Sequence, residues 1–283
     1  MKKLVLVATM AATMCYFTSC GGGKKADQAP ADEAATEANA GYKLTEGLPE
    51  VNLADFPVDD NGWITLFDGQ SLNGWRGYNR PDLPEAWIIE DGALKIQGSG
   101  AGEAGASNGG DVIFAHKFKN FELSLEWKVG KGSNSGIFYL AQEVEGEPIY
   151  ISSPECQVLD NENHPDAKLG KDGNRQSGSL YDMIAAKPQN AKPVGEWNTV
   201  SITSYKGTII HNQNGENVVE YHLWTPQWKE LLNKSKFKEG SEEFPYAFDL
   251  LFNCGGENKE GYIGLQDHGD DVWYRNIKVK ILE

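Results

Sequence analysis

The chain has 283 residues, of which 40% are hydrophobic and 11% aromatic, and its formal net charge at pH 7 is −15. This length and composition are sufficient for one globular domain with a sizeable core. The acidic balance argues against a nucleic-acid-binding protein, because phosphate backbones require a basic surface. A neutral or cationic ligand fits better, although solubility alone would also explain the charge.

Residues 1–19 predict a lipoprotein signal peptide. Two lysines precede a mostly apolar stretch over 4–17, which is too short for a spanning helix and lacks a stop-transfer flank. The sequence Thr18-Ser19-Cys20 resembles a bacterial lipoprotein cleavage site. We therefore expect Cys20 to be lipidated and to anchor the protein in the cell envelope, on the periplasmic or the surface face of the outer membrane. Ordinary secretion is the alternative.

Residues 20–55 predict a disordered tether. Small and charged residues dominate, and large apolar residues are almost absent before Tyr42. Such a segment cannot bury enough surface to offset its ordering entropy. The folded domain is expected to span 56–283. Its two cysteines, Cys156 and Cys254, could form a disulfide after export, but a buried free thiol is the commoner outcome.

Taken in chain order, the rest of the sequence predicts β-structure. The expected strands are 63–67, 87–90, 93–96, 121–129, 136–142, 155–160, 197–205, 208–213, 217–222, 263–266 and 272–282. Asp91-Gly92 suits a type I′ hairpin turn. Residues 121–129 alternate apolar and polar side chains, as a half-buried strand does. Many short strands indicate a sandwich or barrel, and we predict an all-β, two-sheet antiparallel sandwich.

One short helix is expected late in the chain. Thr225 is a suitable cap, Pro226 takes the first position and 227–232 continue the helix. Trp224 and Trp228 flank this helix. Either tryptophan could stack on a sugar ring, although packing of the helix against a sheet is the simpler interpretation.

The strand over 155–160 offers two polar residues on one face. Period two places Glu155 and Gln157 together, and places Cys156 and Val158 on the opposite face. Because Cys156 and Val158 suit the space between two sheets, Glu155 and Gln157 are expected on a concave, ligand-facing surface. An ordinary solvated strand face is the alternative.

Two long loops, over 98–110 and 161–195, add polar candidates. Loops of this length in a compact domain are usually functional or disordered. At the start of the second loop and within it lie Asp160, His164, Arg175 and Tyr181. These residues could contact a ligand or simply solvate a loop. The sequence has no spacing typical of a structural zinc site, no nucleophile elbow, no phosphate loop and no dinucleotide fingerprint.

Residues 262–277 predict a closing hairpin with an unusually polar turn. The turn begins with Gln266, Asp267 and His268 between aromatic and apolar strands. Backbone preferences explain Gly, Asn and Asp in turns, but they do not require a Gln or a His there. Period two places Gln266 and His268 on one face, with Asp267 turned away. We expect this pair to face the same cleft as the polar pair of strand 155–160.

Several motifs, in order along the chain, carry a family resemblance. They are Leu66-Phe67-Asp68-Gly69, Leu72-Asn73-Gly74-Trp75, Gly132-Ser133-Asn134-Ser135-Gly136-Ile137, Glu155-Cys156-Gln157-Val158-Leu159-Asp160, Gly178-Ser179-Leu180-Tyr181, Ser235-Lys236-Phe237 and Gly264-Leu265-Gln266-Asp267-His268-Gly269. On these motifs the sequence resembles the 3-keto-disaccharide hydrolase family, common in Bacteroides-type bacteria, over residues 63–282. The resemblance implies a concanavalin-like jelly roll and a hydrolase or lyase acting on glycosides already oxidised at C3.

The chemistry that this resemblance implies starts at the C3 ketone. The ketone acidifies the C2 proton, a base removes it, the C1 substituent is expelled and water adds back. This requires a base near C2 and an electrophile at the C3 oxygen, which a divalent metal could supply. The implied catalytic residues are Glu155 and His268, each a possible metal ligand, and the implied contacts to the small carbohydrate substrate are Gln157, Asp160, His164, Arg175, Tyr181 and Gln266. Which residue is the base stays open.

Two other functions remain open. One is a conventional glycoside hydrolase of the same fold, which would need two carboxylates. Strand 155–160 offers only Glu155 on its polar face, which counts against that mechanism. The other is a non-catalytic carbohydrate-binding lipoprotein.

Overall fold

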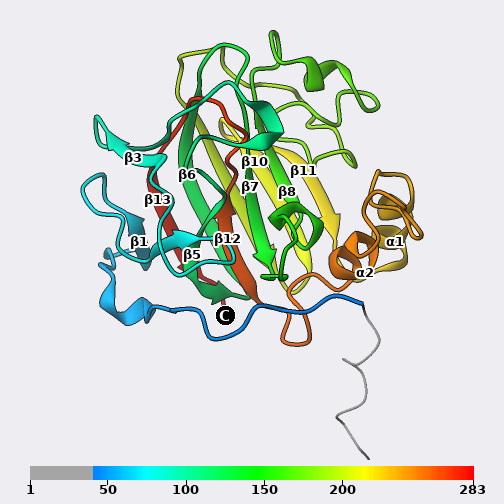
Figure 1. The fold of residues 1–283 in the computed structure, drawn as a ribbon, viewed down its shortest axis with the longest axis horizontal. Coiled ribbons are helices and arrows are strands. Elements are labelled where there is room, and N and C mark those ends of the chain that lie inside the picture. Colours follow the sequence, from blue (N-terminus) through cyan, green and yellow to red (C-terminus); the bar gives the residue numbers. More distant parts are fainter. Residues whose placement is uncertain (1–40) are drawn as a thin grey trace, which may run out of the picture. The chain divides into compact units, whose positions relative to one another are not determined.

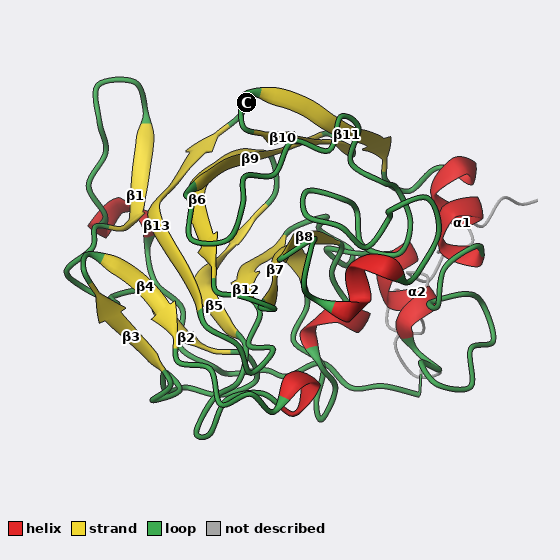
Figure 2. Ribbon diagram, turned by 90° about the horizontal axis from the view of Figure 1, so that it is seen from above, coloured by secondary structure: helices red, strands yellow, loops and turns green. Residues whose placement is uncertain are grey.

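The computed structural model describes residues 41–283, which lie in one compact unit. The predicted signal peptide, Cys20 and the first part of the tether lie outside the described residues. The predicted all-β sandwich is confirmed: two antiparallel sheets pack face to face (Figures 1 and 2). Among the described helices, none is long and apolar enough to cross a membrane.

The larger sheet has eight strands. Its order is β11 (Glu216–His222), β10 (Thr208–Gln213), β9 (Asn198–Tyr205), β6 (Phe121–Val129), β13 (Val272–Ile281), β4 (Ala93–Ile96) and β3 (Trp87–Glu90), with β1 (Trp63–Phe67) also paired to β13. The predicted alternation of β6 is confirmed, since every second residue is buried. Asp91 and Gly92 both have positive φ, as a type I′ turn between β3 and β4 requires.

The smaller sheet has five strands and carries the pocket. Its order is β2 (Trp75–Gly77), β5 (Val112–Phe118), β12 (Gly261–Leu265), β7 (Asn134–Ala141) and β8 (Glu155–Leu159). Every residue of β7, β8 and β12 is buried. One face packs against the larger sheet, and connecting segments cover the other. A strand buried on both faces loses the apolar–polar alternation, so β5, a nearly continuous apolar run, was not predicted.

The predicted closing hairpin is wrong. β12 lies between β5 and β7 in the smaller sheet, whereas β13 lies in the larger sheet. Residues 266–271 therefore cross from one sheet to the other. Two strands with a polar turn look alike in sequence whether the second strand pairs with the first or enters the facing sheet. The crossing brings Gln266 beside β7, where its backbone N–H donates to the carbonyl of Gly136.

The end of the predicted tether belongs to the folded unit. The backbone N–H of Thr45 donates to the carbonyl of Glu143, and that of Val51 donates to the carbonyl of Ala115. Several apolar residues of this segment pack against the core. The predicted boundary at residue 55 was wrong. It rested on the overall composition of residues 20–55, in which these few apolar residues have little weight.

Helices are short and lie mainly at one side of the sandwich. They are α1 (Pro226–Asn233) and α2 (Ala247–Phe252), with 3-10 turns η1 (Leu53–Asp55), η2 (Gly102–Ala104), η3 (Ile149–Ile151) and η4 (Pro165–Lys168). The helix capped by Thr225 is confirmed, and α2 was missed. Trp228 is fully buried and stacks on Tyr221, with ring centroids 5.4 Å apart. The indole N–H of Trp224 donates to the carbonyl of Cys254. Both tryptophans therefore pack the helical region against the sheet.

Cys156 and Cys254 are both free and buried, so the predicted commoner outcome is confirmed.

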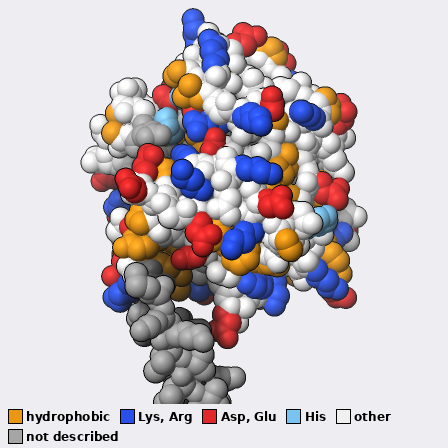
Figure 3. Space-filling view, turned by 90° about the vertical axis from the view of Figure 1, so that its right-hand side faces the viewer, with side chains coloured by type: hydrophobic (Ala, Val, Ile, Leu, Met, Phe, Trp, Pro, Cys, Tyr) orange, Lys and Arg blue, Asp and Glu red, His pale blue; other side chains and the backbone are white. Residues whose placement is uncertain are grey.

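Figure 3 shows basic and acidic side chains interspersed over the face that it presents. The net negative charge is therefore not gathered into one acidic patch on that face.

Candidate active site

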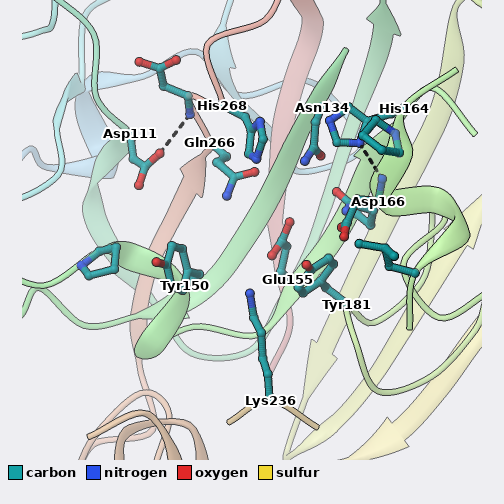
Figure 4. A pocket seen from close by; sticks show the side chains of 15 residues that line it. Asp111, Asn134, Tyr150, Glu155, His164, Asp166, Tyr181, Lys236, Gln266 and His268 are labelled. Carbon is teal, nitrogen blue, oxygen red and sulfur yellow. Dashed lines mark hydrogen bonds between the residues drawn. The ribbon is translucent and has the colours of Figure 1, made fainter. Parts of the chain in front are cut away.

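A pocket of about 380 Å³ lies over the smaller sheet, on the face turned away from the larger sheet. It brings together six of the eight predicted site residues: Glu155, Gln157, His164, Tyr181, Gln266 and His268. Its other lining residues are Asp111, Asn134, Pro148, Tyr150, Pro165, Asp166, Leu169, Lys236 and Asp267. The two polar pairs from β8 and from the segment after β12 therefore line one pocket (Figure 4).

Local strand geometry directs Glu155 into this pocket. Cys156 and Val158 are both nearly fully buried in the core between the sheets, so the predicted assignment of the faces of β8 is confirmed. The neighbouring strand β7 has a glycine at position 136. A Cβ atom built there would overlap a Glu155 carboxylate oxygen and lie 2.8 Å from the carboxyl carbon. Gly136 thus leaves the space that the Glu155 side chain occupies.

Glu155 is a buried carboxyl group without a hydrogen-bond donor among the described residues. Only 7% of the residue is exposed. Burial raises the pKa of Glu155 to about 8; Lys236 opposes the rise, and Asp166 and Asp111 add to it. A carboxyl group that titrates near neutral pH can accept or donate a proton under physiological conditions. It is therefore the strongest acid–base candidate in the pocket.

Lys236 faces Glu155 from the segment that follows α1 (Figure 4). Its ammonium nitrogen lies between 4.8 and 5.2 Å from the ring centroids of four aromatic residues, Tyr150, Tyr181, Phe237 and Phe244. Its backbone N–H donates to Asp182 at 2.8 Å. Cation–π contacts of this kind hold an ammonium group in place. Sequence reasoning recorded Lys236 only within a family motif and gave it no role.

His164 and His268, which line another part of the pocket, form a cluster with Asp270. The potential ligand atoms of these three residues all lie within 4.8 Å of one another. The His164 and His268 rings have centroids 5.7 Å apart. Nδ1 of His164 accepts from the backbone N–H of Asp166 at 3.2 Å. Burial, and then the neighbouring His268, lower the pKa of His164. Of the two predicted possible metal ligands, His268 belongs to this cluster and Glu155 does not.

Asp111 and Asp267 bind the long loop over 98–110 to the pocket wall by hydrogen bonds. The Asp267 backbone N–H donates to Asp111 at 2.9 Å, and its carboxylate accepts from the backbone N–H groups of Ala106 and Gly110. The carboxylate of Asp267 therefore accepts hydrogen bonds from this loop. Burial raises the pKa of Asp111 to about 7. Sequence reasoning missed Asp111, whose only local signal was its position at the end of the long loop over 98–110.

Asp160 and Arg175 do not line the pocket, contrary to their predicted role as substrate contacts. Asp160 accepts hydrogen bonds from the backbone N–H of Gly132 and from the loop residues that follow it. Arg175 binds both Asp166 at 2.8 Å and Asp182 at 2.7 Å. A polar loop must satisfy its own hydrogen-bonding groups, and these two residues do so.

The chain is similar in sequence and in fold to known proteins. The profile of the 3-keto-alpha-glucoside-1,2-lyase-like domain matches residues 62–280. A protein of Bacteroides thetaiotaomicron named 3-keto-disaccharide hydrolase is 58% identical, with both chains covered completely. Two crystal structures of putative glycosyl hydrolases from Parabacteroides distasonis are also similar. The first is 27% identical, has a TM-score of 0.64, and the match covers 79% of this chain and 95% of the other chain. The second is 26% identical, has a TM-score of 0.57, and the match covers 78% of this chain and 99% of the other chain. The chain therefore belongs to the 3-keto-alpha-glucoside-1,2-lyase-like family.

Proposed function

We propose that this protein cleaves the glycosidic bond of 3-keto-glycosides by removing the C2 proton, eliminating the C1 substituent and adding water. The observation that carries the proposal is Glu155, a buried carboxyl group in the pocket with no hydrogen-bond donor among the described residues and a pKa raised to about 8. Burying a carboxyl group without hydrogen-bond donors lowers the stability of the folded protein, but its raised pKa suits acid–base catalysis. The relative named 3-keto-disaccharide hydrolase supports the same reaction class.

In the proposed mechanism Glu155, in its carboxylate form, takes the C2 proton. The electrons of the C2–H bond form an enolate between C2 and C3. As the C3 ketone re-forms, a C1–C2 double bond forms and the C1–O bond breaks, so the leaving group departs as an alcohol after gaining a proton. Water then adds its oxygen to C1 and a proton to C2. The net reaction is hydrolysis, and no external oxidant or reductant is consumed.

Other lining residues suit recognition of the sugar hydroxyls. The side-chain oxygen of Gln157 accepts from the backbone N–H of Val158, which leaves its amide N–H groups as donors. Burial raises the pKa of Tyr181 far above neutral, so its hydroxyl keeps its proton. The pocket volume of about 380 Å³ is near the lower end of ligand pockets. It suits one sugar ring better than a long oligosaccharide.

The deciding experiment compares a 3-keto-glucoside with the same glucoside left unoxidised. The expected result is release of 3-keto-glucose from the first substrate only, with a primary isotope effect when C2 carries deuterium. Cleavage of the unoxidised glycoside would select the conventional glycoside hydrolase. Saturable binding of both sugars without turnover would select a carbohydrate-binding protein.

We also propose that the protein is a lipoprotein of the cell envelope. The support is the signal-like sequence that ends in Thr18-Ser19-Cys20. Metabolic labelling with a fatty acid, followed by membrane fractionation, is expected to label the wild type and not Cys20→Ser. Secretion of an unlabelled wild-type protein would contradict the proposal.

A further inference from the structure

We propose that His164, His268 and Asp270, with the side-chain oxygen of Asn134, bind one divalent transition-metal cation in the pocket. The role of this cation in the reaction rests on the proposed function, whereas its binding does not.

Three chain segments converge on the proposed site. His164 caps η4, Asn134 begins β7, and His268 and Asp270 lie in the crossing between the sheets. The ligand atoms of the two histidines and Asp270 lie within 4.8 Å of one another, a spacing that one ion can bridge. Because His164 uses Nδ1 to accept from the Asp166 backbone, its Nε2 is the nitrogen left to face an ion.

Buried polar atoms without hydrogen-bond partners lie beside the cluster. Among the described residues, three side-chain polar atoms that solvent does not reach have no hydrogen-bond partner. Two of them, Nδ1 of His268 and Oδ1 of Asn134, belong to residues that line this pocket. Asn134 is only 5% exposed, and its backbone N–H donates to Asp270 at 3.1 Å, which ties it to the cluster. A buried polar atom without a partner is costly, and a bound cation removes that cost for both atoms.

The ligand types select the class of cation. Two imidazoles, one carboxylate and one amide oxygen suit Zn²⁺, Mn²⁺ or another first-row dication. Ca²⁺ and Mg²⁺ prefer sites made only of oxygen ligands. The cluster therefore favours a transition-metal ion over Ca²⁺ or Mg²⁺.

The position of the cluster also suits the proposed reaction. Glu155 lies outside the cluster but lines the same pocket. A sugar between the two can present C2 to Glu155 and its C3 oxygen to the cation. A Lewis acid at the C3 oxygen stabilises the negative charge that develops there when the C2 proton leaves.

The test measures metal binding separately from turnover. Protein without a polyhistidine tag is stripped with EDTA, dialysed against Zn²⁺, Mn²⁺, Ca²⁺ or Mg²⁺, and analysed for bound metal. We expect the wild-type protein to bind one equivalent of Zn²⁺ or Mn²⁺. The affinity for the metal should be at least about 100-fold weaker in His164→Ala and His268→Ala, because even residues that only hydrogen-bond to a metal ligand change metal affinity by about 10–100-fold. Circular dichroism verifies folding. His268→Gln, with the visible absorption of bound Co²⁺ as readout, replaces His268→Ala if that variant does not fold.

Two matched variants complete the design. His222→Ala removes an exposed imidazole on β11 and is expected to keep full metal affinity. Glu155→Gln is expected to keep the metal and lose turnover. Failure of the stripped wild-type protein to take up Zn²⁺ or Mn²⁺ would overturn the cation site. Cleavage of 3-keto-glucoside by metal-free protein, unaffected by EDTA, would overturn the role of the cation in the reaction and leave the proposed function standing. Metal bound through the two histidines without turnover would support the site and contradict the proposed function.

Discussion

Two buried glutamates near the smaller sheet have opposite surroundings. Glu143 follows β7 and is 4% exposed, and its carboxylate accepts from the Arg76 guanidinium at 2.6 and 2.8 Å and from the Asn79 backbone N–H at 2.7 Å. Glu155 at the start of β8 is 7% exposed, and no described residue donates a hydrogen bond to it. The two side chains have the same chemistry and nearly the same burial, but only Glu143 accepts hydrogen bonds from described residues.

The contrast separates a structural charge from a functional one. A buried carboxylate with a bidentate partner holds two chain segments together, and removing either partner leaves an uncompensated charge. A buried carboxyl group without hydrogen-bond donors destabilises the folded protein, and its shifted pKa serves acid–base chemistry. Glu143 should therefore control stability, and Glu155 should control turnover.

The largest expected effect is on turnover in Glu155→Gln. This substitution keeps the shape of the side chain and removes the base. We expect kcat/KM for a 3-keto-glucoside to fall by about 10²–10⁴-fold, the range for general acid–base catalysis. Steady-state assays with circular dichroism on the same samples provide the measurement. Wild-type turnover in a folded Glu155→Gln protein would remove Glu155 from the mechanism.

The next effect is on stability in Glu143→Gln. It leaves the buried Arg76 charge without its partner, so the free energy of unfolding should fall by about 3–5 kcal/mol. Urea denaturation measures this change. Glu145→Gln is the matched control, because the Lys43–Glu145 pair is exposed and solvent screens it, so its loss should change stability very little. Equal losses in the two variants would show that the burial of the Arg76 pair is unimportant.

A smaller effect on turnover is expected for Gly136→Ala. The added methyl group would overlap the Glu155 carboxylate and push it from its position. Misplacing a catalytic group by about 1 Å can cost on the order of 10²-fold, so we expect a fall of about 10–100-fold in kcat. Gly146→Ala is the control, since a Cβ there meets no atom within 4 Å, although its positive φ adds backbone strain. Unchanged kcat in Gly136→Ala would mean that Glu155 works from another position.

The last test changes the pH and leaves the wild-type enzyme unaltered. The pKa of Glu155 is raised to about 8, so the fraction of carboxylate grows as the pH rises towards that value. If Glu155 is the base, kcat/KM should rise about tenfold per pH unit below about pH 8 and then level off. A profile measured from pH 5 to 9 checks this. Activity that falls over the same range would identify Glu155 as the acid.

Local sequence patterns were sufficient for much of the fold. The alternation of β6, the Asp91-Gly92 turn and the cap at Thr225 were predicted because each depends on residues close in the chain. The same period of two placed Glu155 and Gln157 on one face of β8, and the pocket confirms that assignment. Alternation and turn chemistry are properties of a few consecutive residues, so they can be read without knowing the partners of a strand.

Only the tertiary structure decided which distant residues meet. It separated β12 and β13 into different sheets, turned the expected hairpin into a crossing, and brought Asp111 and Lys236 to Glu155. It also gathered His164 and His268 from segments about a hundred residues apart and left Asp160 and Arg175 outside the pocket. Strand pairing, burial and the balance of buried charges depend on the whole arrangement of the chain. The sequence by itself therefore identified the family and most of the polar residues, and the packed sheets determined which of them share a site.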